Sequence, residues 1–252
     1  MTERHFNIRY EFSPEEVRKQ IDRRCKEPGG AYVVVADGNI LTMVHKDEEY
    51  RKTVDGAMFS ICDSSWVPLY LKLIHGFKPV QYCGSDIFAD MIGVKKYTMA
   101  FLGTSQETLN ALKAELCGED PRIADMHFEP LPFCDADGFD YGKIAEGINS
   151  FSPDIVWVAL GAPKQERFAE RLAPHLRRGV IIPVGAVFNF RAGLGIRRAP
   201  DWMVKCHLEF AYRIASEPRK QFKRVWRILT ATPAIIAEEA RTKKRSRKDS
   251  AR

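Results

Sequence analysis

The sequence predicts an α/β protein with a doubly wound, mostly parallel Rossmann-like sheet and a basic helical C-terminal appendage. Two observations support this prediction. Continuous apolar runs of strand length alternate with helical segments between residues 31 and 185, which is typical of parallel sheets covered by helices on both faces. After Arg197 the strand-like runs stop and only helical patterns continue. We therefore expect an α/β domain over residues 1–195 and the appendage over residues 196–252.

Local sequence signals place the elements along the chain. Ser13, Pro14 and Glu16 form a helix start, with an N-cap, a first-turn proline and a capping box. The appendage is expected to hold two or three helices, broken at Pro218 and Pro233. Between the first helix and the appendage, the patterns predict strands at 31–36, 57–62, 97–103, 123–129, 154–160 and 179–185. They predict helices from about 39 to 54, from after Asp63 to 75, at 84–92, at 105–116, at 141–150 and between the last two strands.

The composition is that of a globular protein in a reducing compartment. Its 45% hydrophobic and 29% charged residues are ordinary for such a chain of 252 residues. No apolar run approaches the roughly 20 residues that span a bilayer, and the N-terminus lacks the apolar core of a signal peptide. The six cysteines are scattered without a CxxC pair, which favours reduced thiols in a cytosolic protein over disulfides or a zinc site.

Charge is distributed unevenly along the chain. Residues 197–252 contain 16 Lys/Arg and 6 Asp/Glu, a net charge of +10, whereas residues 1–196 contain 23 and 27, a net charge of −4. Such asymmetry suggests a polyanionic partner, namely an anionic membrane surface, nucleic acid or phosphate groups. For residues 241–252 a solvated, disordered tail is an interpretation of equal weight.

The residues that follow each predicted strand are the candidate site, because open parallel sheets bind ligands beyond the carboxyl ends of their strands. Asp63 has two interpretations: it caps the next helix, as an Asp before Ser-Ser-Trp does well, or it serves as a general base at the sheet edge. The spacing leaves both open. The candidate segments are 37–39, 63–66, 103–105, 161–166 and 185–189.

Several cofactor motifs are absent from the sequence. No GxGxxG follows the first strand, and neither GxxxxGK[ST] nor HExxH occurs, which argues against a nicotinamide dehydrogenase, a P-loop NTPase and a metalloprotease-like zinc site. Asp135 and Asp137 have the spacing of a metal-binding DxD motif. Because they lie in a Pro/Gly-rich segment, an ordinary loop is the favoured interpretation, and we predict neither a metal nor a cofactor.

The stretch LGAPKQE, from Leu160 to Glu166, joins a strand-like run to a helical one. Its small residues let the backbone approach a ligand closely, and Pro163 suits a first helical position. The helix N-terminus and Lys164 would then present N–H groups and a positive charge to an anion. This is a phosphate-binding arrangement, but the same residues also make an efficient strand-to-helix turn, and physical chemistry alone favours the turn.

Together with other blocks in the same order, LGAPKQE resembles the WecG/TagA/CpsF glycosyltransferases over about residues 31–230. GSDIF at 84–88 corresponds to the G-x-D-[LI]-F block of that family. The remaining blocks are GAPKQE at 161–166, GAVFNFRAGLGIRRAPDWM at 185–203 and LEFAYRIASEPRKQFKR at 208–224.

The resemblance implies transfer of a sugar from a UDP-sugar to a polyprenyl-diphosphate-linked saccharide during cell-surface polysaccharide synthesis, with inversion and without a metal. Asp63 falls on the catalytic aspartate of the family and would deprotonate the acceptor hydroxyl. Lys164, the backbone of 161–165 and C-terminal arginines such as Arg224 would neutralise the leaving diphosphate. The expected substrate-binding residues are Asp37, Asn39, Gln81, Gly103, Gly161, Lys164, Gln165, Glu166, Asn189, Arg198, Arg213 and Arg219.

The resemblance also gives the basic appendage a function. In the family the C-terminal segment helps to close the active site and places the enzyme on the membrane. Apolar residues beside basic ones suit an interfacial helix, although packing on the domain is the alternative. We therefore expect a cytoplasmic protein that is peripheral on the inner face of the plasma membrane, able to form a homo-oligomer and without a nucleic-acid partner. The apolar residues are Phe210, Tyr212, Phe222, Trp226, Ile228 and Leu229.

Five positions depart from the family pattern, and the first is Ser64, which follows Asp63 where the family has a glycine. Val35 and Asp37 stand where the family usually has the Thr and Asn of a T-x-N motif, Gln81 stands where an arginine is common, and Asn189 replaces the aspartate of F-D-F. The departures favour a divergent subfamily with another sugar or another way of holding the diphosphate. A non-catalytic relative that binds sugar nucleotide or lipid-linked glycan is the alternative, but the retained Asp63 favours an active enzyme.

Overall fold

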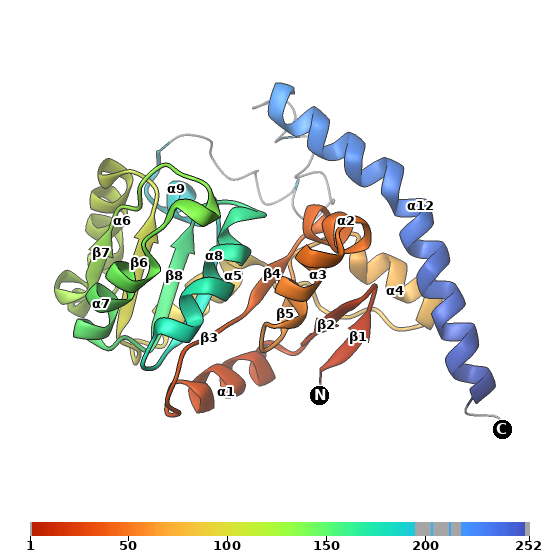
Figure 1. Cartoon of the computed structure of the whole chain (residues 1–252), viewed down its shortest axis with the longest axis horizontal. Coiled ribbons are helices and arrows are strands. Elements are labelled where there is room, and N and C mark those ends of the chain that lie inside the picture. The colour runs from red at the N-terminus through yellow and green to blue at the C-terminus, as the bar shows by residue number, and fades with distance from the viewer. Residues whose placement is uncertain (1, 195–202, 204–211, 213–217, 250–252) are drawn as a thin grey trace.

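A computed structural model gives the structure of the chain and describes residues 2–194, 203, 212 and 218–249 (Figure 1). Its strands form two sheets. The larger has five parallel strands in the order β3-β9-β8-β6-β7, and the smaller has four in the order β1-β2-β5-β4, of which only the β1–β2 pair is antiparallel. The strands are β1 Glu3–His5, β2 Ile8–Tyr10, β3 Ala31–Tyr32, β4 Val34–Ala36, β5 Ser60–Cys62, β6 Met99–Gly103, β7 His127–Glu129, β8 Ile155–Ala159 and β9 Val180–Pro183. The predicted mostly parallel α/β class is confirmed.

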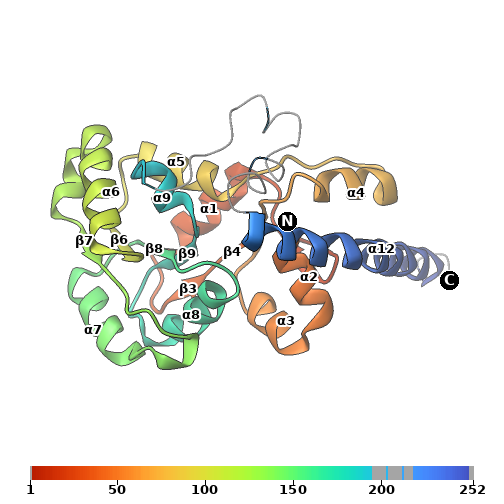
Figure 2. The ribbon, with the colours of Figure 1, turned by 90° about the horizontal axis from the view of Figure 1, so that it is seen from above.

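Helices cover both faces of the sheets (Figure 2). Ile155 and Trp157 of β8 enter one apolar core and Val156 and Val158 enter the other, because successive side chains of a strand point to opposite faces. Helices α1, α5, α6 and α9 supply the first core, and the others supply the second. The helices are α1 Pro14–Arg24, α2 Gly38–Lys46, α3 Glu48–Asp55, α4 Val67–His75, α5 Gly84–Gly93, α6 Gln106–Glu119, α7 Tyr141–Phe151, α8 Lys164–Leu172, α9 Val187–Arg191 and α12 Pro218–Asp249.

The predicted strand 31–36 is split between the two sheets. Its first part, β3, pairs with β9, and its second part, β4, pairs with β5. The N–H groups of Val33 and Val34 donate in succession to Ile181 O and to Phe59 O, each at 3.1 Å. The apolar run marks a segment that is buried throughout, but it carries no information about which strand it pairs with. This segment therefore joins the sheets and brings their carboxyl ends together.

Two other predictions need correction, and one hairpin was missed. The helix expected from 39 to 54 is broken at Asp47, which ends α2 and caps α3 by accepting the Tyr50 N–H at 3.0 Å. The first residues of the strand expected at 123–129 belong instead to a 3₁₀ turn, Pro121–Asp125. The hairpin β1–β2 was not predicted, because its strands are short. Phe6 and Asn7 form its turn with φ values of 52° and 61°.

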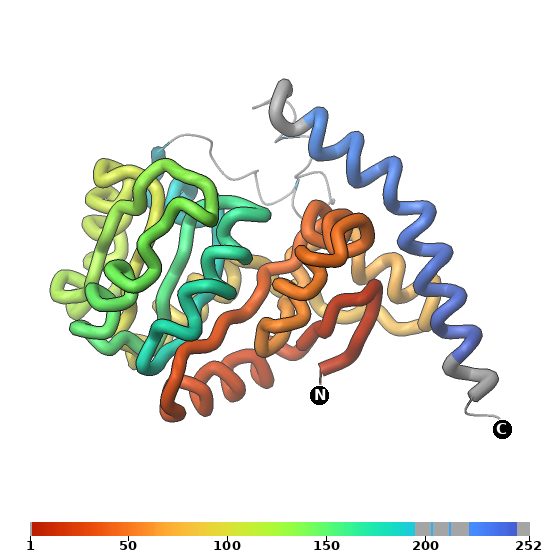
Figure 3. Tube along the Cα trace, in the orientation of Figure 1, coloured from red at the N-terminus to blue at the C-terminus, as the bar shows by residue number. Residues whose placement is uncertain are grey.

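The C-terminal helix α12 is continuous from Pro218 to Asp249, so the predicted break at Pro233 is wrong. Proline removes one backbone hydrogen bond from a helix. Here Ala231 and Ile235, on either side of Pro233, are buried against the rest of the chain and hold the helix in place. Helix α12 packs on α2 and α4 beside the smaller sheet (Figure 3). None of the helices described is both long and apolar enough to cross a membrane.

Candidate active site

A cavity of about 460 Å³ lies where the carboxyl ends of β4, β5, β8 and β9 meet. The N-terminus of α5 and one face of α12 complete its wall. The sequence predicted a site beyond the carboxyl ends of the strands, and the structure brings part of that site together in this cavity. The individually predicted residues that line the cavity are Asp37, Asn39, Asp63, Gln81, Gly161, Gln165 and Arg224.

Asp63 follows β5 directly and is held from two sides. Its carboxylate Oδ1 accepts the backbone N–H of Gly84 at 2.9 Å, at the start of α5, and its carbonyl accepts the Gln81 side-chain amide at 3.1 Å. The helix-capping interpretation of Asp63 is wrong, because the Ser64 hydroxyl accepts the N–H groups of Trp66 and Val67 at the start of α4. The Asp63 carboxylate instead faces the start of another helix at the cavity wall.

Asn39 lines the cavity and carries a buried side-chain oxygen, Oδ1, without a hydrogen-bond partner among the described residues. Its side chain is only 6% exposed. An unpaired buried polar atom costs roughly 1–3 kcal/mol.

The positive side of the cavity comes from α12. Arg224 pairs with Asp37, whose other oxygen caps α2 by accepting the N–H groups of Asn39 at 2.8 Å and Ile40 at 2.9 Å. Arg227 lines the same cavity three residues further along. The cavity therefore holds a carboxylate, Asp63, that can accept a proton, and two guanidinium groups that can bind an anion.

The LGAPKQE turn is closed by its own hydrogen bonds. Gly161, at a φ of 76° that favours glycine, donates its N–H to Gln165 Oε1 at 3.0 Å, and Gln165 donates its own N–H to the Gly161 carbonyl at 3.0 Å. The Gln165 amide also donates to Glu166 Oε1 at 2.8 Å. Gln165 thus lines the cavity while it fixes the turn.

Glu166 lies behind the cavity wall rather than in it. The side chain is fully buried, and the Tyr50 hydroxyl donates to its Oε2 at 3.1 Å. Burial raises the pKa of Glu166 to about 7, although the hydrogen bond from Gln165 acts in the opposite direction. Glu166 therefore supports Gln165, and its predicted place among the substrate-binding residues is not matched by a contact with the cavity.

We expect Glu166→Gln to remove a pH dependence of stability. The folded-state pKa of about 7 exceeds the ordinary 4.5, so the folded protein binds more protons between these pH values and its stability falls as pH rises through them. At pH 8 the variant should be more stable than the parent, by on the order of 2–3 kcal/mol. Urea unfolding from pH 5 to pH 8 measures this difference. Glu170→Gln, on the same helix and only partly buried, is the control, and parallel pH curves for parent and Glu166→Gln would contradict the assignment.

Several predicted residues lie elsewhere. The Lys164 ammonium donates to Cys134 O at 3.0 Å and lies over the rings of Phe133 and Phe139, so in this structure it does not line the cavity. Gly103 and Asn189 are also absent from the lining. A Cβ at Gly103 would lie 2.7 Å from Ala159 O, which explains that glycine by packing. Outside the described residues lie Arg198 and Arg213, together with the side chain of Arg219.

Sequence reasoning missed other lining residues. Arg227 and Ser85 contribute to the wall, and neither falls in a segment that follows a predicted strand. Arg227 could not be located without knowing how α12 packs. Asp137 pairs with Arg171 on the surface, in agreement with the loop interpretation of the DxD spacing. Within the described part of the chain, three metal-ligand-type side chains converge only at His5, His75 and Glu239, none of which lines the cavity.

A parallel α/β sheet with a carboxylate and two arginines in one cavity at its carboxyl edge has the layout of a group-transfer enzyme with an anionic substrate. The model of the glycosyl transferase WecG/TagA/CpsF family matches residues 5–248, and the chain belongs to that family. The resemblance noted from its motifs is confirmed, and the protein is a glycosyltransferase.

Three relatives of this chain carry the name N-acetylglucosaminyldiphosphoundecaprenol N-acetyl-beta-D-mannosaminyltransferase. The Bacillus subtilis (strain 168) protein is 26% identical over 219 residues, which cover 85% of this chain and 82% of the relative. The Bacillus spizizenii protein is 27% identical over 216 residues, or 82% of this chain and 77% of the relative. The Staphylococcus aureus (strain MW2) protein is 23% identical over 223 residues, which cover 86% of this chain and 82% of the relative.

Proposed function

We propose that this protein transfers a sugar from a UDP-sugar to a polyprenyl-diphosphate-linked saccharide, with inversion and without a metal ion. The observation that carries the proposal is that Asp63, Arg224 and Arg227 line one cavity in a member of this family. The names of the relatives support an N-acetylglucosaminyl diphosphate lipid as acceptor and N-acetylmannosamine as the first sugar to test.

In the proposed reaction Asp63 accepts the proton of the acceptor hydroxyl. The oxygen attacks the anomeric carbon as the bond from that carbon to the diphosphate breaks, and UDP leaves with both bonding electrons. One such displacement inverts the carbon. The Gly84 N–H holds the Asp63 carboxylate in place, while Arg224 and Arg227 neutralise the charge that develops on the diphosphate.

The departures from the family pattern fit a different way of holding the donor. Asp37 caps α2 and pairs with Arg224, so it orients a guanidinium instead of contacting the diphosphate directly. Gln81 supports the backbone of Asp63.

The test is UDP release by the full-length protein with a panel of UDP-sugars and a synthetic polyprenyl-diphospho-N-acetylglucosamine. Acceptor-dependent UDP release with a glycosylated lipid product supports the proposal. Binding of UDP-sugar without turnover for any donor would instead favour the non-catalytic relative. Full activity in the presence of a chelator would support the metal-independent route, and loss of activity that Mg²⁺ restores would contradict it.

We also propose that α12 places the protein on the inner face of the plasma membrane. Phe222, Trp226 and Leu229 recur at helical spacing on its outer side, and each is more than 60% exposed. Lys223 and Arg227 lie beside them and are exposed as well. An apolar stripe flanked by basic residues is suited to the surface of an anionic bilayer.

Replacing Phe222, Trp226 and Leu229 together by serine should reduce sedimentation with vesicles containing anionic lipid by at least about tenfold, because each large apolar side chain contributes up to roughly 1.5–3 kcal/mol when fully buried. Phe151→Ser, which removes an exposed apolar side chain from α7, is the control. Unchanged sedimentation of the triple variant would contradict the assignment of this face.

A further inference from the structure

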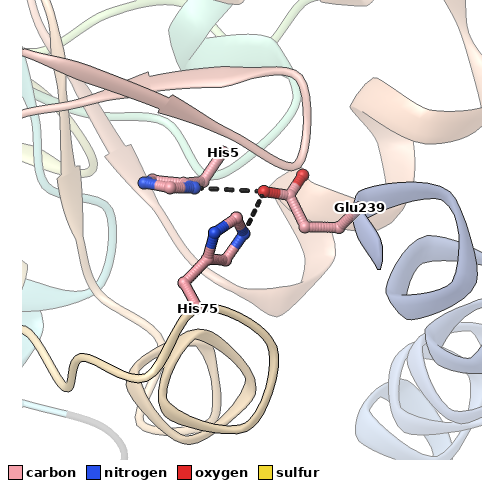
Figure 4. A group of neighbouring side chains, drawn as sticks. All are labelled: His5, His75 and Glu239. Carbon is pink, nitrogen blue, oxygen red and sulfur yellow. Dashed lines mark hydrogen bonds and ion pairs between the residues drawn. The ribbon is translucent and has the colours of Figure 1, made fainter. Parts of the chain in front are cut away.

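A cluster of three polar side chains outside the cavity joins distant parts of the chain. Glu239 of α12 lies between His5 of β1 and His75 at the end of α4 (Figure 4). Its Oε1 lies 3.0 Å from His5 Nδ1 and 2.8 Å from His75 Nε2, and its Oε2 accepts the Phe6 backbone N–H at 2.7 Å. Glu239 is 6% exposed, so water competes little for these contacts. We call His5, His75 and Glu239 the latch.

The distances identify the latch as a set of direct hydrogen bonds and ion pairs. Separations of 2.8–3.0 Å between nitrogen and oxygen are ordinary donor–acceptor distances. Both oxygens of Glu239 are occupied by donors, which is what a buried carboxylate requires.

The latch lies on the same face of α12 as the arginine that reaches the cavity. Along this face Arg224 pairs with Asp37, and Ala231 and Ile235 are buried. Lys243 binds Ile74 O beyond the latch. Spacings of four or seven residues keep all of these side chains on one side of the helix. Arg224 and Glu239 are about 22 Å apart along the axis of α12. Because the helix is continuous between them, the bonds of Glu239 also fix the rotation of α12 about its axis and its position along that axis at Arg224.

We propose that Glu239 is a positioning residue of the transferase: the latch fixes α12 in the rotation that brings Arg224 and Arg227 to the cavity. The inference rests on the proposed function for the role of the arginines, but the docking of α12 stands on the contacts alone.

The charges around the latch give this docking a pH window. Burial alone would lower the pKa of His5, but hydrogen bonds with Glu239 and Glu3 outweigh it and raise the pKa. Burial alone would raise the pKa of Glu239, but hydrogen bonds from His5, the Phe6 N–H and His75 outweigh it and lower the pKa. The other groups that face the latch are Glu3 on β1, His45 on α2, which pairs with Glu238 at 2.8 Å, and Lys243 on α12.

The signs of the two shifts define the window. The stability that His5 contributes is fully present below its ordinary pKa of 6.5 and is lost as pH rises through its raised pKa. The stability that Glu239 contributes is fully present above its ordinary pKa of 4.5 and is lost as pH falls through its lowered pKa. Docking of α12 is therefore firmest between about pH 4.5 and 6.5 and weakens on both sides.

Hydrogen exchange of the full-length protein tests the docking without any assumption about activity. In Glu239→Gln the amides of α12 should exchange about tenfold faster at pH 6, while those of β6 and β8 stay protected. Glu238→Gln, the same change one residue earlier on a half-exposed side chain, is the matched control and should change exchange by less than about twofold. Unaltered exchange of α12 in Glu239→Gln would overturn the proposal.

A second measurement tests the positioning. UDP affinity and transferase kcat/KM should both fall by about tenfold in Glu239→Gln, and the fall of wild-type kcat/KM above the raised pKa of His5 should disappear. Faster exchange of α12 with unchanged UDP affinity would show a merely structural contact and overturn the positioning role.

If no UDP-sugar is turned over by the wild type, the proposed function fails, while exchange and UDP affinity still decide the inference. An increase in thermal stability with equimolar Zn²⁺ that Glu239→Gln abolishes would reveal a metal site and overturn the latch.

Discussion

Asp63→Asn is expected to reduce glycosyl transfer by a factor of about 10²–10⁴. The asparagine has nearly the same shape and keeps an oxygen for the Gly84 N–H, which the carboxylate accepts at 2.9 Å. It cannot take the proton of the acceptor hydroxyl, so the attack on the anomeric carbon must proceed without a base. The rate of UDP release at saturating donor and acceptor measures the loss, which should appear in kcat rather than in the donor KM.

Two controls separate chemistry from folding. Thermal stability and UDP affinity of Asp63→Asn should remain close to those of the parent, since the hydrogen bond with Gly84 is kept. Asp135→Asn makes the same substitution in the exposed loop before α7 and should leave the rate unchanged. Wild-type turnover by a correctly folded Asp63→Asn would rule out Asp63 as the base and turn attention to other groups of the cavity wall.

The pattern of apolar residues predicted the fold because it indicates which residues are buried. The runs at 154–160 and 179–185 are apolar on both faces, and the strands β8 and β9 lie in the middle of the larger sheet. Pairing was not predictable in the same way. Residues 31–36 are equally apolar but divide between two sheets, because the partner of a strand depends on distant segments and not on its own pattern.

Pro233 shows the limit of local signals in the helices. Proline is a reliable stop when nothing else holds the helix, and the sequence alone indicates a break. The structure keeps one helix because Ile228, Ala231 and Ile235 contact the domain along its length. Tertiary packing of an apolar face contributes more than the one hydrogen bond that the proline removes.

The part of the candidate site that follows the strands could be predicted from the sequence, and the part that does not could not. Asp37, Asp63 and Gly161 come directly after strands, and the rule that ligands bind at the carboxyl edge found all three. The role of Gln165 in closing its turn was not visible, because it depends on a side-chain rotamer. His5, His75 and Glu239 carry no spacing signal, since they meet only after α12 has packed.

The second large effect is expected from the arginines of α12. Changing Arg224 and Arg227 together to glutamine should lower kcat/KM by about 10²–10³, because the diphosphate then leaves without the charges that stabilise it. The loss should include weaker UDP binding, unlike that of Asp63→Asn, since a diphosphate is already anionic in the ground state. Arg241→Gln, an exposed position on the same helix, is the matched control.

Arg224→Gln alone has a second consequence that must be separated, because it leaves the half-buried Asp37 without its partner. Loss of one partner of such a pair can destabilise by leaving the other charge uncompensated. The double variant Asp37→Asn/Arg224→Gln removes both charges and keeps an oxygen to cap α2. If Arg224 acts on the diphosphate, the double variant regains stability but not UDP affinity. If it regains both, Arg224 only neutralises Asp37, and the diphosphate is held by Arg227 and by residues beyond the wall described.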